Sequence, residues 1–422
     1  MIKKILTYGF GEVLVKGISF LAVPLYSYMI LPSEYGTLGF LNALVAFLPF
    51  IFTFYYLYGY VRFSVEEKVN ELISTYFFLG ILLSLFYLLA SIVVYLLVIQ
   101  NYNIKLKYFI LSILASSSIF LFQIMQMYYR SKGEARKYIK FSMLYSVAGL
   151  LLNFLFLTLF EDNVFAMLSS SLLNSLLLSI VAFYILREYI FWEYFNLKLV
   201  KKILKYTVPL VPGAIALLLF SQSDKLILVK YISKEQLGVY TMAFTLGLSM
   251  SYIGSAFFMG YQPIFYEKIA SNLKLDIEKQ FSKNVFLIIG ALLISWFTIY
   301  IIYNFIDIKY ISGLKISLLI ALAYSMMTFA QMMELHLTYI KKTSIVSIIY
   351  GIGGILTVLI LILLVPLYGG FGASISLCIG AFFISIFMYV FGQKYFYLNY
   401  NVLYTLFFYS SILLLSGGLY VC

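Results

Sequence analysis

The chain has 422 residues, of which 63% are hydrophobic and only 11% are charged, and its mean hydropathy is +0.99. Soluble domains carry roughly 25% charged and 45–50% apolar residues, so the composition excludes a soluble globular protein and predicts a polytopic membrane protein. The net charge of +12 does not indicate nucleic-acid binding, because the basic residues fall between apolar segments. One histidine and two cysteines, Cys378 and Cys422, predict neither a metal cluster nor a disulfide framework.

Apolar segments long enough to span a membrane follow one another along the chain. About 20 apolar residues cross the hydrocarbon core of a bilayer. This criterion predicts an all-α protein with about 12–13 transmembrane helices. They lie at 5–31, 35–61, 74–100, 107–130, 138–160, 163–186, 205–231, 235–264, 281–305, 311–336, 343–366, 369–392 and 400–421. The first run is too long for a signal peptide and is expected to be retained, whereas the last is either a thirteenth span or an interfacial segment.

The distribution of lysine and arginine predicts how the chain crosses the membrane. With the N-terminus in the cytoplasm, most of the 29 Lys and Arg residues fall in cytoplasmic segments, as the positive-inside rule requires. The longest such segment, 187–204, mixes aromatic residues with a basic end and is typical of a segment lying on an anionic leaflet.

A weak internal repeat relates the two halves of the chain. Gly36 and Gly238 each follow a polar break at the end of a long apolar run. Six spans per half is an even number, so the halves share one orientation and form two six-helix bundles related by a parallel repeat. The expected organisation is an N-terminal six-helix lobe (1–190), a cytoplasmic linker (191–204), a C-terminal six-helix lobe (205–394) and an additional C-terminal helix (395–422).

Charged residues inside the predicted spans are the first candidates for function, because charge within a bilayer is costly. Glu12 and Lys16 are four residues apart on one helix face, so they can pair in a central cavity or lie near the cytoplasmic end. Asp224 and Lys225 are adjacent and project about 100° apart, so one is expected on the substrate path and the other against a neighbouring helix or at the outer interface.

Three further residues complete the set of candidates. Glu334 is a candidate, with Asp224, for coupling transport to an ion, and the alternative is that Glu334 pairs with Lys341 or Lys342. Arg62 ends the second span and could bind a diphosphate, although a topological role would also explain it. His336 is expected to be a polar residue between helices. The candidates for the substrate path are therefore Glu12, Lys16, Arg62, Asp224 and Lys225.

Four sequence segments together resemble one family of membrane transporters. They are LAVPLYSYMILPSEYGTLG (Leu21–Gly39), YYRSKGEARK (Tyr128–Lys137), SDKLILVKYISKEQLGVY (Ser223–Tyr240) and VPLYGGFGASIS (Val365–Ser376). In this order and spacing they resemble the Wzx-type polysaccharide flippases. These belong to the polysaccharide transport family of the multidrug/oligosaccharidyl-lipid/polysaccharide exporter superfamily.

The resemblance implies a flippase with a MATE-like fold of two six-helix bundles in a bacterial cytoplasmic membrane. Its substrate would be an oligosaccharide on polyprenyl diphosphate, moved from the cytoplasmic to the outer leaflet by alternating access. The resemblance also implies a cationic cavity, coupling to H+ or Na+, and no cofactor. The expected partners are membrane lipids, a polysaccharide polymerase and glycosyltransferases. Arg62 and Lys16 are the residues that would make the cavity cationic.

Two alternatives remain open at this point. An ion-coupled multidrug extruder of the same superfamily would share the architecture, but a cationic cavity disfavours cationic drugs. A membrane glycan polymerase would be an enzyme, but the predicted outer loops are short and the sequence lacks Walker, GxSxG and HExxH motifs. We therefore expect a transporter rather than an enzyme.

Overall fold

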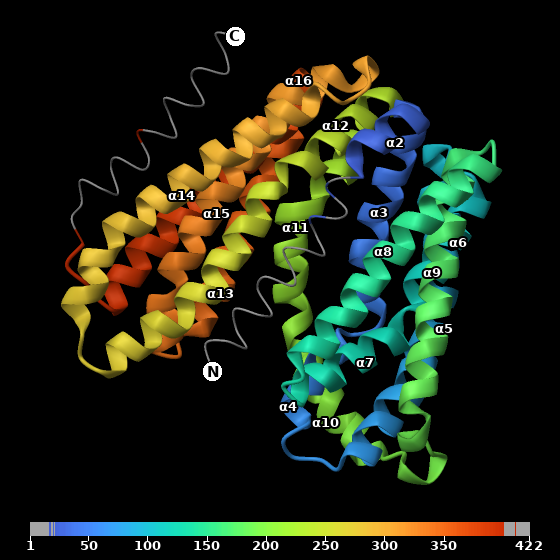
Figure 1. The fold of residues 1–422 in the computed structure, drawn as a ribbon, viewed down its shortest axis with the longest axis horizontal. Helices are drawn as coiled ribbons and strands as arrows, with labels where there is room; N and C mark the ends of the chain where they lie inside the picture. Colours follow the sequence, from blue (N-terminus) through green and yellow to red (C-terminus); the bar gives the residue numbers. More distant parts are fainter. Residues whose placement is uncertain (1–16, 18–19, 21, 401–409, 411–422) are drawn as a thin grey trace. The chain divides into compact units, whose positions relative to one another are not determined.

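The computed structural model describes residues 17, 20, 22–400 and 410. In this part of the chain every regular element is a helix and no strand occurs (Figure 1). Ten of the described helices are long and apolar enough to cross a membrane. The predicted all-α, polytopic fold is therefore confirmed, whereas the grouping into two six-helix bundles stays a prediction.

Two predicted boundaries change in the structure. α16 (Thr343–Tyr395) joins the predicted spans 343–366 and 369–392 at Gly369, whose φ of +55° and ψ of −132° interrupt the helix. The predicted span 35–61 was too long, because α3 (Pro32–Phe52) ends nine residues earlier. Of the segment 5–31, α2 (Val23–Met29) is described, and 400–421 lies almost entirely outside the described residues.

The described chain divides into two compact units. The N-terminal unit is Thr37–Leu218, and the C-terminal unit combines the residues up to Gly36 with those from Leu219 onward. These limits fall inside α3 and α11, so the units differ from the predicted lobes, 1–190 and 205–394, which stay predictions together with the linker and the C-terminal helix.

The N-terminal unit is built around α9, which packs against α6, α7 and α8. Its core is rich in aromatic side chains, with Tyr60 and Tyr76 almost fully buried near one end. Its helices are most of α3, α4 (Tyr60–Phe63), α5 (Val69–Leu97), α6 (Leu106–Ser118), α7 (Phe120–Ser131), α8 (Ala135–Leu159), α9 (Asn163–Leu186), α10 (Leu197–Thr207) and the start of α11 (Val211–Leu228). Short 3-10 helices connect them: η1 (Tyr56–Gly59), η2 (Ile99–Tyr102), η3 (Arg187–Tyr189), η4 (Trp192–Tyr194) and η5 (Val208–Leu210).

The C-terminal unit is organised around α15 (Leu314–Tyr339), a largely buried helix that contacts four others. These are α12 (Lys234–Gly247), α13 (Ser249–Ala270), α14 (Lys274–Tyr303) and α16. Figure 1 shows α13, α14 and α15 running side by side. The 3-10 helix η6 (Ile308–Gly313) precedes α15. α2 belongs to this unit as well, since Ser27 Oγ accepts a bond from the Asp307 amide at 3.0 Å and the Ile30 carbonyl accepts one from Tyr310 at 3.0 Å.

The two glycines that marked the internal repeat lie against each other in the C-terminal unit. A Cβ at Gly36 would lie 2.9 Å from the Gly238 nitrogen and closer still to the Lys234 carbonyl oxygen. A Cβ at Gly238 would lie 2.9 Å from Pro32 Cα. The contact is reciprocal, because Gly36 and Gly238 are as far apart in the sequence as Pro32 and Lys234. Reciprocal contacts of this kind arise around a local two-fold axis.

Polar residues at the helix ends explain where several helices begin. Ser233 and Gln236 form a capping box at the start of α12, and Asn196 accepts bonds from the first amides of α10. Asn196 also ties α10 to α5, because its amide nitrogen donates to Thr75 Oγ1 and its side chain bonds Glu71. The basic linker is thus docked on the N-terminal unit through hydrogen bonds.

Candidate functional site

The N-terminal unit contains a cavity of about 810 Å³ formed by the end of α3, η1, α4 and α7. Arg62 of α4 and Arg130 of α7 line it. α7 also contributes Gln123 and Gln126, which share a helix face with Arg130 because they are seven and four residues before it. Four tyrosines complete its polar lining, Tyr55, Tyr56, Tyr58 and Tyr206. The cavity therefore combines two cations with amides and aromatic rings.

A turn at the end of α3 places the aromatic wall of this cavity. Phe54 and Tyr55 both have positive φ, 53° and 54°, a left-handed conformation that side-chain-bearing residues rarely adopt. The Tyr55 ring then stacks on Tyr58, with centroids 4.8 Å apart, and also contacts Phe50 at 4.9 Å. Two consecutive strained residues beside a cavity fit a functional constraint on the position of Tyr55.

The two arginines differ in their partners. Arg62 pairs with Glu66 at 2.5 Å, but both side chains are about half exposed, and such surface pairs contribute little stability. Arg130 has no carboxylate within ion-pair distance among the described residues and is exposed. Burial raises the pKa of Tyr55. The neighbouring Tyr58 adds to this rise, whereas the nearby charge of Arg130 opposes it. Both guanidinium groups can therefore exchange their present surroundings for an anion.

The C-terminal unit contains a buried ionic cluster on α11 and α12. The Asp224 side chain is fully buried and Lys225 is 4% exposed. The Lys225 ammonium lies 3.3 Å and 3.4 Å from the two Asp224 oxygens, and Tyr240 donates a 2.5 Å bond to Asp224 Oδ2. The ammonium also lies over the Phe244 ring, 3.4 Å from its centroid. Burial of the charges is thus offset by pairing, hydrogen bonding and a cation–π contact.

This cluster corrects the prediction made from the spacing of Asp224 and Lys225. Adjacent helical residues project about 100° apart, so the two were expected to point to different surroundings. Their side chains nevertheless meet, because the long lysine side chain reaches back to the carboxylate, while the expected contact with a neighbouring helix is present between Asp224 and Tyr240 of α12.

Glu334 and His336 of α15 have neutral partners. Glu334 is half-buried and accepts a 2.8 Å bond from Tyr350, and the alternative considered for it, an ion pair with Lys341 or Lys342, does not occur among the described residues. The Lys342 ammonium instead lies 3.6 Å from the centre of the Tyr395 ring. His336 is fully buried, and its Nε2 lies 2.7 Å from the Tyr400 hydroxyl, which confirms a polar contact between segments.

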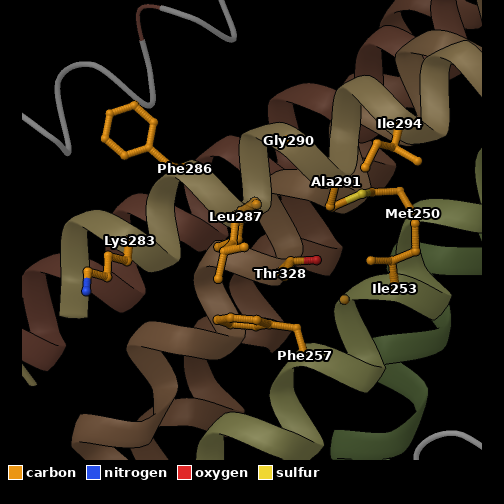
Figure 2. Close-up of a pocket in the computed structure, with 12 residues that line it drawn as sticks. Met250, Ile253, Phe257, Lys283, Phe286, Leu287, Gly290, Ala291, Ile294 and Thr328 are labelled. Atoms are coloured by element: carbon orange, nitrogen blue, oxygen red, sulfur yellow. The ribbon is translucent and has the colours of Figure 1, made fainter.

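A second cavity, of about 680 Å³, lies between α13 and α14 in the C-terminal unit. Figure 2 shows Met250, Ile253 and Phe257 of α13 across from side chains of α14, with Thr328 of α15 between them. Most of the residues that line this cavity are apolar. The Thr328 hydroxyl, which also lines it, donates a hydrogen bond to the Tyr324 carbonyl at 2.9 Å. Among the residues that the structure describes, Lys283 is the one charged residue that lines it.

Comparison with known protein families decides the classification. A family model described as "Polysaccharide biosynthesis protein" matches residues 1–268, which is more than half of the chain. The chain belongs to this polysaccharide biosynthesis protein family. No sequence among the curated proteins matches it.

Solved structures with a similar fold include a lipid flippase and transporters. This chain is similar to a structure described as lipid II flippase MurJ in an inward closed conformation, with a TM-score of 0.71 and 13% identity over 98% of this chain and 90% of that one. It is also similar to an inward-facing multidrug resistance MATE family transporter of the MOP superfamily, with a TM-score of 0.62 and 15% identity over 93% of this chain and 92% of that one. A MOP superfamily transporter from Pyrococcus furiosus has a TM-score of 0.57 and 14% identity over 93% of this chain and 95% of that one. At these identities the likeness establishes the fold, which agrees with the resemblance found in the sequence.

The residues predicted for the substrate path fall into three groups. Asp224 and Lys225 meet in the C-terminal unit, Arg62 lines the cavity of the N-terminal unit, and Glu12 and Lys16 lie outside the described residues. Arg130 was missed as a site residue. It lies in the segment Tyr128–Lys137 that carried part of the family resemblance, but a basic residue at the end of a span was already explained by topology.

Proposed function

We propose that the protein is a flippase that moves a polyprenyl-diphosphate-linked oligosaccharide from the cytoplasmic to the outer leaflet of a bacterial cytoplasmic membrane. The family supports a role in polysaccharide synthesis, and the fold is one found in transporters and in a lipid II flippase. A polysaccharide polymerase and glycosyltransferases would act on either side of this step. The protein itself would catalyse no covalent chemistry.

The observation that carries the proposal is the arginine- and tyrosine-lined cavity. Guanidinium groups bind phosphate oxygens through paired, charge-assisted hydrogen bonds, and Arg62 and Arg130 supply two of them. The amides of Gln123 and Gln126 can exchange hydrogen bonds with sugar hydroxyls, and the tyrosine rings offer flat apolar faces for sugar rings. A diphosphate joined to a glycan has both of these chemistries.

The apolar cavity between α13 and α14 suits the remaining part of such a substrate. A polyprenyl chain needs apolar contact along its length, and this cavity provides it from Met250 to Ile294. The polar head requires protein because its hydroxyl and phosphate groups would lose their water in hydrocarbon without replacement.

Alternating access would move the head group across the membrane. A protein with two repeated helical lobes can expose a central site first to one side and then to the other by rocking one lobe against the other. Protons or sodium ions would drive this movement, and the buried Asp224 and the half-buried Glu334 are the candidates among the described carboxylates for coupling.

The test is to measure lipid-linked oligosaccharide on the cytoplasmic leaflet after depletion of the protein. We expect the intermediate to accumulate and wild-type protein to relieve the accumulation. Arg62→Ala/Arg130→Ala should fail to relieve it at equal abundance, with flipping reduced at least tenfold, since two charge-assisted contacts are lost. Arg136→Ala is the matched control, because this exposed arginine follows the same span and does not line the cavity.

Other outcomes of this experiment would support different functions. Normal lipid-linked glycan with increased sensitivity to cationic drugs would favour a multidrug extruder, which the fold of MATE transporters also suits. The arginine-lined cavity disfavours this second candidate, because it repels cations. Lipid-linked units that reach the outer leaflet but stay unpolymerised would favour a polymerase.

A further inference from the structure

The surroundings of Asp224 leave its carboxylate with no free oxygen. Oδ1 accepts from the Lys225 backbone amide at 2.8 Å and lies 3.3 Å from the Lys225 ammonium. Oδ2 lies 3.4 Å from the same ammonium and accepts from Tyr240 at 2.5 Å. The side chain is fully buried, so water does not reach it. The charge of Asp224 is therefore balanced entirely by its own neighbour in the sequence.

The position of the Lys225 ammonium has the features of a binding site for a small monovalent cation. Two carboxylate oxygens and the Gln222 side-chain oxygen, at 3.4 Å, surround it on one side. The Phe244 ring covers another side, with its centroid 3.4 Å from the ammonium nitrogen. Anionic and amide oxygens with an aromatic face are groups that attract a cation, whether it is free or part of a side chain.

We infer that Lys225 is a tethered cation that replaces a coupling sodium ion at Asp224. A sodium ion does not fit beside Asp224 in this arrangement, because both oxygens are already engaged and two cations would repel strongly in a buried site. The inference rests on the proposed flippase for its physiological meaning. In that protein, sodium would not be bound at Asp224, and among the candidates that the structure describes Glu334, whose partner is the neutral phenol of Tyr350, is the carboxylate left for coupling.

A purely structural ion pair would have the same geometry, and the two roles differ in what happens when Lys225 is removed. If the ammonium occupies a cation site, its loss should leave a buried carboxylate that recruits sodium. If the pair only holds α11 in place, the loss should destabilise the protein in every salt. Asp224→Asn/Lys225→Met removes both charges and leaves no unpaired charge, so it is the matched control.

The experiment is thermal unfolding of the purified full chain in sodium, potassium or choline chloride at equal ionic strength. Wild type gives the reference difference between the salts, because Glu334 stays available for coupling in every variant. Lys225→Met should unfold about 3 °C higher in sodium than in choline, because binding to the folded state alone raises its melting temperature. The double variant should lose this difference. A folded Lys225→Met protein that does not distinguish the salts would overturn the inference.

Sodium-22 binding to wild type and to Asp224→Asn provides a second measurement that does not require Lys225→Met to fold. Equal binding by the two proteins supports the tethered cation. Sodium bound by wild type and lost in Asp224→Asn would overturn it. Neither measurement depends on flipping, so the proposed function can fail while this inference stands, and the reverse is also true.

Discussion

At the scale of single residues, the Asp224 cluster is held together by one phenol as much as by the ion pair. The Tyr240 side chain is fully buried, and its 2.5 Å bond ends on a charged oxygen. Hydrogen bonds to charged groups contribute more than neutral ones, and the Lys225 ammonium lies farther from this oxygen, at 3.4 Å. Removing only the hydroxyl group of Tyr240 should therefore destabilise this cluster.

We predict that Tyr240→Phe lowers the free energy of unfolding by about 1.5–3 kcal/mol, because it leaves Asp224 Oδ2 without its shortest hydrogen bond. Denaturant unfolding in detergent measures the change. Tyr231→Phe, at a half-exposed tyrosine between α11 and α12, should change stability by less than about 0.5 kcal/mol. Equal stability of Tyr240→Phe and Tyr231→Phe would contradict the role assigned to the phenol.

Sequence reasoning at this scale identified charges but not their partners. Asp224 and Lys225 were candidates because charge in an apolar segment is conspicuous, and both are indeed buried. Their mutual contact depends on the bend of one flexible side chain, which residue spacing does not encode. Tyr240 could not be selected from 40 tyrosines, because only the packing of α12 against α11 brings it to the carboxylate.

At the scale of helices, the contact between α3 and α12 requires glycine at both crossing points. A Cβ at Gly36 or at Gly238 would meet backbone atoms of the other helix, which cannot move aside as a flexible side chain can. Small residues let helix backbones approach closely, and here the same device occurs at equivalent positions of the repeat.

We predict that Gly36→Ala and Gly238→Ala each lower the free energy of unfolding by about 1–3 kcal/mol, because the added methyl group overpacks the contact between α3 and α12. The reciprocal geometry predicts similar losses for the two variants. Gly260→Ala is the control, since a Cβ there meets nothing within 4 Å. Thermal unfolding of the three proteins compares them, and a Gly36→Ala protein as stable as Gly260→Ala would refute the close contact.

A second helix-scale prediction concerns the cap of α9. Asp162 accepts bonds from the Phe165 amide at 3.0 Å, Lys107 at 2.7 Å and Tyr108 at 2.8 Å. Burial tends to raise the pKa of Asp162, but the bonds from Lys107, Phe165 and Tyr108 outweigh it and lower the pKa. A lowered pKa means that the stabilisation is complete above the ordinary value, about 3.9, and is lost as the pH falls through the folded-state pKa.

Asp162→Asn should therefore be less stable than wild type at pH 6 by about 1 kcal/mol, because the amide can still cap the helix but loses the charge to which Lys107 and Tyr108 donate. The difference should shrink below pH 4 as wild type loses the same charge. Unfolding measured between pH 6 and pH 3 gives both values. Asp276→Asn, at an exposed aspartate in the first turn of α14, should follow the wild-type profile throughout. A difference that is constant with pH would exclude the charged cap.

Helix positions were predictable because each span needs a long apolar run, and the breaks between runs are polar or glycine-rich. The turn at Gly369 and the short segment before α12 followed from this pattern. The early end of α3 did not, because Phe54 and Tyr55 are apolar residues in a left-handed turn, a conformation that their composition does not signal.

At the scale of the whole molecule, the charge distribution predicts which loops face the cytoplasm. We expect a membrane-impermeant maleimide to label Glu161→Cys in intact cells and Lys198→Cys only after permeabilisation. Both positions are exposed, and the background protein would carry Cys378→Ser and Cys422→Ser. Labelling of Lys198→Cys in intact cells would reverse the predicted orientation, because Lys198 lies in the basic linker that the positive-inside rule assigns to the cytoplasm.

The last prediction concerns the apolar cavity between α13 and α14, which joins the proposed function to a single position. Gly290 lines this cavity, and a Cβ there meets nothing within 4 Å, so a larger side chain can enter the cavity without striking the protein. If the cavity holds the polyprenyl chain during transport, Gly290→Trp should fill the space that the chain needs and slow flipping about tenfold. Gly290→Ala leaves nearly all of that space open and should flip at the wild-type rate.

Stability separates this effect from damage to the fold. Gly290→Trp adds apolar contact inside the unit, so its melting temperature should equal or exceed that of wild type, whereas a misfolded variant would melt lower. A stable Gly290→Trp protein that flips normally would show that the lipid tail travels elsewhere, and it would leave the arginine-lined cavity of the N-terminal unit as the part of the proposal still supported. A stable protein that flips slowly would support the cavity between α13 and α14 as the path of the lipid tail, because filling apolar space removes the contacts that a polyprenyl chain needs.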